Sequence, residues 1–401
     1  MGKWDMVRLG DVCEILNGFA FKSNNYVDSG YRVIRITNVQ KGVIVDDDPK
    51  YYTASQTLDK YKLHDKDLLI SLTGNVGRVG LIREDLLPAY LNQRVACLRE
   101  KNPALSKEFL FSFLNFDNFE RAAISSSKGL AQKNMSTEWL KDYEIPLPPL
   151  EAQQQIADAL DRASALIEKR KTQIEKLDLL VRSQFFEMFG DPVTNPKGWP
   201  VRKLKEIALA IQSGNTPKGG KQVYVDSGIM FFRSQNVWRN KIELSDIAYI
   251  EEKTHKKMSQ TRLKNKDILI TKTGRFNTEN SSLGRAALFL GDDDSANING
   301  HVYLVRLDEN SAHEFILYIL ITDEYRDYIR KVCVGGIDKR QINKEHLEEF
   351  PIIMPPTELQ CQFSDFFLQV ETQKYLLQKS LQKLEINYKS LMQKCFNGEI
   401  F

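Results

Sequence analysis

The chain has 401 residues, 42% of them hydrophobic and 27% charged, which is typical of a folded globular protein with more than one domain. Its longest apolar run, residues 315–321, is far shorter than the roughly 20 residues of a membrane helix, and no apolar signal segment follows the first residues. These short apolar runs predict no membrane partner. The five cysteines are odd in number and never form a CxxC pair, which predicts a reduced, cytoplasmic protein without disulfides.

The charge balance says little about partners. Lysine and arginine number 56 and aspartate and glutamate 53, so the formal net charge is only +3. A nucleic-acid-binding protein with this balance has to gather its basic side chains in patches or share the electrostatic work with a partner. Composition therefore neither requires nor excludes DNA binding.

An internal repeat spans the whole chain. Tyr26-Val-Asp-Ser-Gly30 returns unchanged as Tyr224-Val-Asp-Ser-Gly228, and the order and spacing of the other matches hold over nearly the whole of each half. The offset between the copies grows from 195 to 207 residues and then stays constant. The further matched pairs are Trp4 with Trp199, Leu9 with Leu204, Arg35 with Arg233, Asn38 with Asn236, Asn92 with Asn299, Arg99 with Arg306, Gly129 with Gly336, and Gln153 with Gln360.

Each half begins with a predicted globular α+β domain, covering residues 1–147 in the first half and 191–354 in the second. Residues 67–72 and 267–271 are apolar runs bounded by turn residues, as buried strands are. Glu108 to Phe119 and Ala312 to Arg330 are predicted to be amphipathic helices. The two domains are expected to share one fold.

Each half ends in a predicted long helix, covering residues 148–190 and 355–401. A Pro-Pro pair precedes each helix and prevents helix upstream of it, and Gly190 and Gly398 mark the ends. Apolar residues recur every seven positions, which favours an antiparallel coiled-coil pair and a pseudo-two-fold arrangement over two ordinary core helices. The two heptad series are Ile156, Ala163, Arg170, Leu177, Gln184 with Leu160, Ile167, Ile174, Val181, Met188 in the first helix, and Phe363, Val370, Leu377, Leu384, Leu391 with Phe367, Lys374, Leu381, Tyr388, Cys395 in the second.

The length of these helices suggests a spacing function. A helix of ~36 residues is about 54 Å long at about 1.5 Å per residue. DNA half-sites one helical turn apart are separated by roughly 34–36 Å. We therefore hypothesise that the helix pair holds the two domains on successive stretches of one face of DNA.

With these residues assembled, the chain resembles the specificity subunits of type I restriction-modification enzymes over its whole length. The resemblance rests on the opening Trp-x4-Leu, on Lys66-Asp-Leu-Leu-Ile70 and its copy, on the Pro-Pro-x-Glu-x-Gln segments, and on Phe189-Gly-Asp-Pro192. It implies two target-recognition domains, each reading one part of a split DNA site and separated by long helices. Single residues depart from the pattern at the helix starts, such as Ala152 and Thr357.

The resemblance also implies the partners and cofactors. Two methyltransferase subunits would bind the chain and carry S-adenosylmethionine, and restriction subunits would add ATP and Mg²⁺. The chain itself would bind double-stranded DNA, would hold no cofactor and would not be an enzyme.

The sequence offers no catalytic constellation of its own. The segment from Gly214 to Gln222 nearly matches a phosphate-binding loop, but its lysine is displaced and no Ser/Thr follows, so a flexible basic loop is the simpler interpretation. No Asn/Asp-Pro-Pro-Tyr segment is present for methyl transfer. The five histidines lack metal-ligand spacing, and the acidic runs 46–48 and 292–294 are more simply solvated turns than metal sites.

Candidate DNA contacts are Arg, Lys, Asn and Gln side chains in loops, because these groups pair with base edges and neutralise phosphates. Those present in both copies, such as Arg35 with Arg233 and Asn38 with Asn236, can serve the scaffold or the phosphate backbone instead. The candidates are Arg35, Asn38, Arg78, Gln93, Arg94, Lys128, Gln132 and Lys133 in the first domain, and Lys218, Lys221, Arg233, Gln235, Asn236, Arg275, Asn277, Lys339, Arg340 and Gln341 in the second.

Two other functions compete with DNA recognition. One is an enzyme that acts on DNA, which the missing motifs disfavour. The other is a coiled-coil adaptor that binds only proteins, for which the long helices would suffice. Binding of the chain and its methyltransferase to a split DNA site would argue against the adaptor, and methylation by the chain alone would favour the enzyme.

Overall fold

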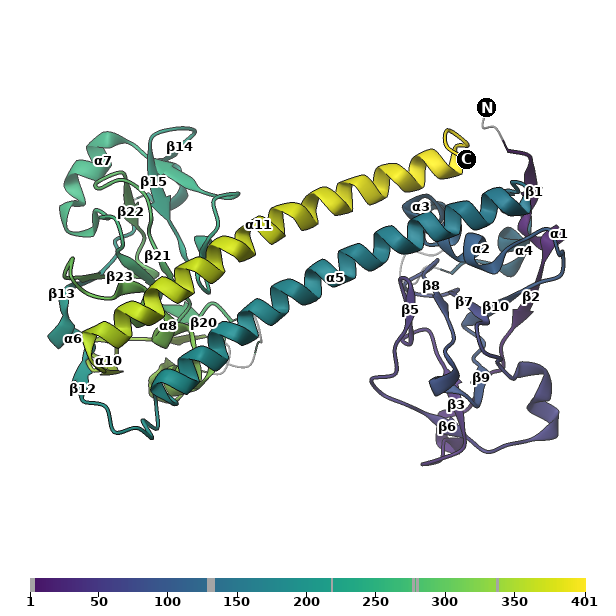
Figure 1. The fold of residues 1–401 in the computed structure, drawn as a ribbon, viewed down its shortest axis with the longest axis horizontal. Helices are drawn as coiled ribbons and strands as arrows, with labels where there is room; N and C mark the ends of the chain where they lie inside the picture. Colours follow the sequence, from purple (N-terminus) through teal and green to yellow (C-terminus); the bar gives the residue numbers. More distant parts are fainter. Residues whose placement is uncertain (1–3, 128–133, 218, 276–277, 279–280, 337–338) are drawn as a thin grey trace. The chain divides into compact units, whose positions relative to one another are not determined.

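The computed structural model describes residues 4–127, 134–217, 219–275, 278, 281–336 and 339–401, without the side chain of Lys221. The chain divides into two compact units. Unit 1 comprises residues 1–172 and 379–401, and unit 2 comprises residues 173–378. Each unit therefore contains the globular part of one repeat, the start of the helix that follows it, and the end of the other repeat's helix. Figure 1 labels the two long helices, α5 (Leu150–Phe189) and α11 (Thr357–Phe396), each of which begins in one unit and ends in the other.

The core of unit 1 is built on a four-stranded antiparallel sheet in the order β2-β10-β7-β8. Its strand β7 is buried at every residue, as predicted for residues 67–72. A smaller sheet, β6-β3-β9, contains one parallel pair, and β4 with β5 forms a hairpin. The strands are β1 (Met6–Arg8), β2 (Cys13–Asn17), β3 (Tyr31–Ile34), β4 (Val39–Gln40), β5 (Val43–Ile44), β6 (Tyr51–Tyr52), β7 (Leu68–Ser71), β8 (Val79–Leu81), β9 (Ala89–Leu91), β10 (Val95–Glu100) and β11 (Glu144–Pro146).

Unit 2 repeats this topology and adds strands to it, since its second sheet, β14-β18-β15-β22, has four strands. Its central sheet has the order β13-β23-β19-β21, its second sheet again contains a parallel pair, β15 with β22, and β16 with β17 forms the hairpin. A three-stranded sheet, β20-β25-β24, is present only here among the described residues. The strands are β12 (Val201–Lys203), β13 (Ala208–Ser213), β14 (Tyr224–Val225), β15 (Ile229–Phe232), β16 (Val237–Trp238), β17 (Lys241–Ile242), β18 (Ala248–Ile250), β19 (Ile268–Thr271), β20 (Thr273–Gly274), β21 (Ala286–Leu288), β22 (Ala296–Ile298), β23 (Val302–Leu307), β24 (Val334–Gly335), β25 (Arg340–Gln341) and β26 (Pro351–Ile353).

The short helices correct one prediction. Residues 108–119 and 312–330 do not each form one helix, because an extended residue, Phe116 or Thr322, interrupts both. The Thr322 hydroxyl accepts a hydrogen bond from the N–H of Tyr325 at 3.3 Å and so caps a new helix. The short helices are α1 (Leu9–Val12), α2 (Lys107–Leu114), α3 (Asp117–Ser126), α4 (Thr137–Asp142), α6 (Leu204–Ile207), α7 (Glu252–Lys257), α8 (His313–Ile321), α9 (Asp323–Val332) and α10 (Lys344–Glu348).

The two long helices are α5 (Leu150–Phe189) and α11 (Thr357–Phe396), each 40 residues long and unbroken. A buried glutamine fixes each start: the side-chain amide of Gln153 donates to the carbonyl of Pro148, and that of Gln360 donates to Pro355, both at 2.7 Å. All residues of the predicted heptad series are buried or half-buried. The Pro-Pro-x-Glu-x-Gln segments are therefore helix starts.

The long helices pack antiparallel, since in each unit the start of one lies against the end of the other. In unit 1, Ile156 and Leu160 of α5 share a core with Cys395 and Phe396 of α11. In unit 2, the ring centroids of Phe185 and Phe363 are 5.2 Å apart. Each globular part is thus completed by the helix end of the other repeat.

A matched tryptophan closes the end of each long helix. The indole N–H of Trp199 donates to the carbonyl of Phe189 at 3.0 Å, at the end of α5. That of Trp4 donates to the carbonyl of Cys395 at 3.3 Å, at the end of α11. These bonds satisfy helix-end carbonyls that have no partner within the helix. The opening Trp-x4-Leu of each repeat therefore anchors the other repeat's helix.

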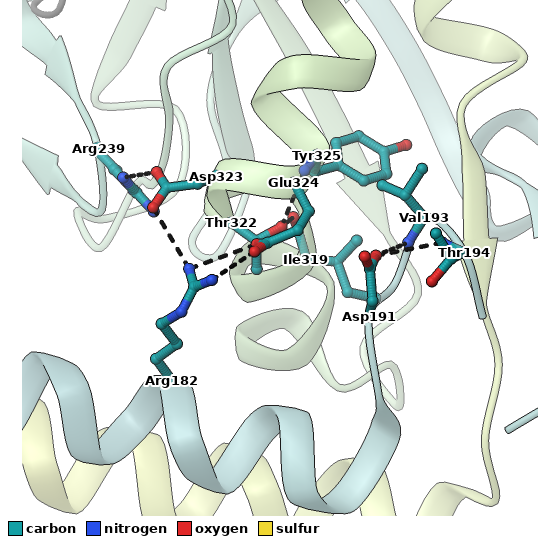
Figure 2. Close-up of polar contacts among 10 residues, drawn as sticks. All are labelled: Arg182, Asp191, Val193, Thr194, Arg239, Ile319, Thr322, Asp323, Glu324 and Tyr325. Carbon is teal, nitrogen blue, oxygen red and sulfur yellow. Dashed lines mark hydrogen bonds and ion pairs between the residues drawn. The ribbon is translucent and has the colours of Figure 1, made fainter. Parts of the chain in front are cut away.

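Figure 2 shows how the end of α5 is fixed within unit 2. The Arg182 guanidinium forms ion pairs with Glu324 at 2.5 Å and with Asp323 at 3.4 Å, at the N-terminus of α9. Arg239, in the β16–β17 hairpin, pairs with the same Asp323 at 2.7 Å. Beyond α5, the Asp191 carboxylate accepts the N–H groups of the turn that follows the helix. The hairpin, α9 and α5 are held together as one body.

Unit 1 contains a related contact. Lys41 of the β4–β5 hairpin forms an ion pair with Asp117 at the start of α3, and lies 3.4 Å from Glu120. The hydrogen bond from Lys41 lowers the pKa of Asp117. Both hairpins are therefore tied by a cation to the first residue of the homologous helix.

Candidate DNA interface

A buried ion pair orders the central sheet of each unit in the same way. The guanidinium of Arg99 donates to both carboxylate oxygens of Asp67, at 3.0 and 2.6 Å. Arg306 does the same to Asp267, at 2.9 and 2.7 Å. The hydrogen bonds to these carboxylates raise the pKa of both arginines. This pair explains the repeated Lys-Asp-x-Leu-Ile segment, whose aspartate is a structural residue.

A second repeated element is a tight turn between the two sheets of each unit. It contains Asn92 in unit 1 and Asn299 in unit 2, each 8% exposed. The side-chain oxygen of Asn92 accepts the backbone N–H of Arg94 at 3.2 Å, and that of Asn299 accepts the N–H of His301 at 3.0 Å. The turn therefore presents the residue two positions after the asparagine in a fixed backbone conformation.

A glycine presses against each of these turns. A Cβ atom on Gly18 would lie 2.2 Å from the carbonyl oxygen of Asn92, and one on Gly214 would lie 2.0 Å from that of Asn299. Both distances are far below van der Waals contact, so no other residue fits without movement of the backbone. Gly214 is accordingly a packing glycine, and its resemblance to a phosphate-binding loop is fortuitous.

Two further segments meet each turn and complete what we call the reading edge. In unit 1 the N–H of Leu72 donates to the carbonyl of Arg94 at 3.0 Å, and the N–H of Met135 donates to the carbonyl of Leu72 at 2.8 Å. In unit 2 the same two bonds join Lys272 to His301 and Ile342 to Lys272, at 2.8 and 2.9 Å. The reading edge comprises residues 92–94, 72–78 and 134–136 in unit 1 and residues 299–301, 272–285 and 339–343 in unit 2, as far as these are described.

The structure brings several of the predicted DNA contacts to the reading edges. Gln93 and Arg94 are exposed on the edge of unit 1. Arg275, Lys339 and Gln341 are exposed on the edge of unit 2, and Arg340 is half-buried there. Other predicted contacts, Lys128, Gln132, Lys133, Lys218, Asn277 and the side chain of Lys221, lie outside the described residues.

Other predicted contacts are engaged inside the protein. Asn38 and Asn236 are 4% and 1% exposed. The Asn38 side chain accepts the N–H of Arg35 and donates to the carbonyl of Val45 at 2.8 Å, and Asn236 repeats the pattern with Arg233. Their side chains are structural, because both ends of each amide are used internally, so neither stays among the proposed DNA contacts.

Four more of the predicted contacts also have partners inside the protein. Arg35 and Arg233 pair with Asp48 and Asp246 at 3.3 and 3.1 Å. The guanidinium of Arg78 hydrogen-bonds the Gln40 side chain, and Gln235 donates to Asp246 at 3.1 Å. DNA contact by these four side chains would have to compete with internal partners.

Residue-type reasoning missed His301 and Lys272 on the edge of unit 2. His301 is exposed, and the Lys272 ammonium lies 5.3 Å from the centre of the Tyr303 ring. Residue type alone suggests His301 only as a metal ligand. The repeat identifies His301, because matching Asn92 with Asn299 also matches Arg94 with His301. Among the described residues, no cluster of three or more His, Cys, Asp or Glu side chains is arranged to hold a metal.

Comparison with known proteins matches this duplicated architecture. A family model described as "Type I restriction modification DNA specificity domain" matches residues 1–177 and again residues 196–386. The chain belongs to this family. The family is the non-catalytic specificity component of type I restriction systems, which agrees with the lack of catalytic motifs in the sequence.

Individual members are distant in sequence but similar in length. The type I restriction enzyme EcoBI specificity subunit of Escherichia coli is 21% identical over 99% of this chain and 86% of its own length. The MjaVIII specificity subunit of Methanocaldococcus jannaschii is 23% identical over 99% of this chain and 93% of its own. The crystal structure of the S subunit from M. genitalium superposes with a TM-score of 0.60 at 15% identity, covering 98% of this chain and 96% of that one. The fold is therefore that of a specificity subunit.

No helix in the described parts of the chain combines the length and the apolar character needed to cross a bilayer.

Proposed function

We propose that this chain selects the DNA target of a type I restriction-modification system, with each unit reading one part of a split site through its reading edge. The observation that carries the proposal is the duplication of the edge: the same asparagine, glycine and backbone contacts build it in both units, while its exposed side chains differ. A common frame with divergent loop residues suits two readers of different sequences.

The proposed DNA contacts on the two edges are the half-buried Arg340 and the exposed Gln93, Arg94, Arg275, Lys339 and Gln341, with Lys272 and His301 added. Lys128, Gln132, Lys133, Lys218, Lys221 and Asn277 remain proposed from their residue type and loop position, and Arg35, Arg78, Arg233 and Gln235 as contacts that must first leave internal partners.

We also propose the assembly that the family implies. Two methyltransferase subunits bring S-adenosylmethionine, and restriction subunits bring ATP and Mg²⁺. The proposed boundaries are 1–147 and 191–354 for the target-recognition domains and 148–190 and 355–401 for the helices. The unbroken 40-residue helices support a role as spacer between the two half-sites.

The direct test is selection from random DNA by the purified chain together with its methyltransferase subunits. The proposal expects a motif of two short specific parts separated by a spacer of fixed length. Binding of the methyltransferase without any sequence preference would favour a protein adaptor, and methyl transfer by the chain alone would favour an enzyme. Deleting one heptad from both long helices should change the spacer and leave both half-site sequences unaltered.

A further inference from the structure

We infer that one position of the reading edge, Arg94 in unit 1 and His301 in unit 2, determines specificity within its half-site. This inference rests on the proposed function that each unit reads one part of a split site. It goes further by assigning base discrimination to one position of the repeat, which carries a different side chain in each unit.

The backbone of this position is fixed on both sides. Its N–H donates to the buried asparagine side chain, at 3.2 Å for Arg94 and 3.0 Å for His301. Its carbonyl accepts from the N–H of Leu72 in unit 1 and from that of Lys272 in unit 2. The glycines at 18 and 214 close the space behind the turn. A fixed backbone sets the position of the Cβ atom, and so the place on the edge from which the side chain can reach a base.

The side chains at this position are exposed, and neither has an internal partner among the residues that the structure describes. The Arg94 guanidinium makes no hydrogen bond or ion pair with any residue that the structure describes. Other arginines of the same globular part are engaged, namely Arg8, Arg32, Arg35, Arg78, Arg83, Arg99 and Arg121. The His301 ring is likewise free within the described chain, whereas the rings of His255 and His313 bond to Asn297 and to the carbonyl of Ser311. A charged or polar group that is exposed on a fixed turn, with no partner in the described parts of its unit, is available to a ligand.

The two side chains read different features of a base pair. A guanidinium can donate two parallel hydrogen bonds to O6 and N7 of guanine in the major groove, which no other base accepts in the same way. An imidazole offers one donor or acceptor at each ring nitrogen and fits a single acceptor such as a purine N7. The position facing Arg94 should therefore be a G·C pair with strong discrimination, and the one facing His301 should discriminate less sharply.

The experiment measures the motif selected by the complex with the methyltransferase subunits for wild type, Arg94→Ala, His301→Ala and the exchanges Arg94→His and His301→Arg. Arg94→Ala should reduce the preference for one base pair of one half-site by about 10- to 100-fold. His301→Arg should sharpen one position of the other half-site. The matched controls are Arg83→Ala and Arg202→Ala, which remove exposed arginines away from the edges and should leave the motif unchanged.

The outcomes separate the inference from its premise. If wild type selects no split motif, the proposed function fails and the inference falls with it. If wild type selects such a motif but the Arg94 and His301 variants keep it, with affinity unchanged or lowered equally for all sequences, these side chains contact phosphates or nothing, and the inference alone is wrong. Thermal unfolding of each variant should match wild type, because the substituted side chains are exposed.

Discussion

The frame of each unit, meaning its Asp–Arg pair and the glycine behind its turn, is the same in both repeats, whereas the side chains of the reading edge differ. The frame is retained contact for contact: Asp67 with Arg99 corresponds to Asp267 with Arg306, and Gly18 to Gly214. On the edge, Gln93 and Arg94 of the first repeat correspond to Gly300 and His301 of the second. Exposed side chains contribute little to stability, so the edge can change without loss of the fold. A protein that must read two different sequences is free to vary there.

The long helices, unlike the frame and the edge, do not stay within one unit. Each follows one repeat in the sequence, but its start packs in one unit and its end in the other. Phe189 at the end of α5 lies in the core of unit 2, and Phe396 at the end of α11 lies in the core of unit 1. The two residues occupy equivalent positions of the repeat. The globular part of the first repeat is therefore incomplete without the last turns of the second.

The largest expected effect comes from removing these end residues. Phe189→Ala and Phe396→Ala should each cost about 3–5 kcal/mol, because they empty well-packed sites. Hydrogen exchange should show faster exchange in unit 2 for Phe189→Ala and in residues 4–127 of unit 1 for Phe396→Ala. The control Leu179→Ala, at a residue 63% exposed on α5, should change stability by less than about 0.5 kcal/mol. Loosening of residues 4–127 by Phe189→Ala and not by Phe396→Ala would contradict the exchanged packing.

The next largest effect tests whether the two frames are equivalent. Arg99→Met and Arg306→Met should each destabilise their own unit by roughly 2–4 kcal/mol, because a buried carboxylate loses its partner. Chemical denaturation followed by hydrogen exchange measures the loss unit by unit. Arg83→Met, which breaks an exposed pair with Asp85, should cost no more than about 1 kcal/mol. A large effect in only one unit would mean that the frames have diverged.

A smaller effect is expected from the glycines behind the turns. Gly18→Ala and Gly214→Ala place a methyl group against a backbone carbonyl, and should cost about 1–3 kcal/mol. Each should also weaken selection of one half-site, since the reading edge must shift. Gly336→Ala is the control, because no atom of the described residues lies within 4 Å of the added methyl group. Equal loss of both half-sites on Gly18→Ala would argue against separate edges.

Much of the architecture follows from the sequence, for physical reasons that differ between elements. The heptad series and the Pro-Pro pairs predicted the long helices correctly, because periodicity and helix starts are local properties. The single helices predicted across Phe116 and Thr322 were wrong, since one extended residue interrupts each helical pattern and, at Thr322, a side-chain cap starts the new helix. Apolar periodicity alone does not register such a break.

The candidate site was harder to predict, because residue type does not reveal where a polar group finds its partner. Asn38 and Asn236 are suitable for base recognition, yet the fold buries both amides among backbone groups. The ion pairs of Arg35 and Arg233 are equally invisible without coordinates. His301 is predictable from the repeat, since it lies two residues after Asn299 as Arg94 lies two residues after Asn92.

The central claim is that two homologous units read two parts of one DNA site independently. The most direct measurement replaces residues 1–147 with the equivalent segment of another family member and determines the methylated motif by sequencing DNA modified by the assembled complex. The account predicts that one half of the motif changes while the other half and the spacer stay the same. A change in both halves, or in neither, would contradict it.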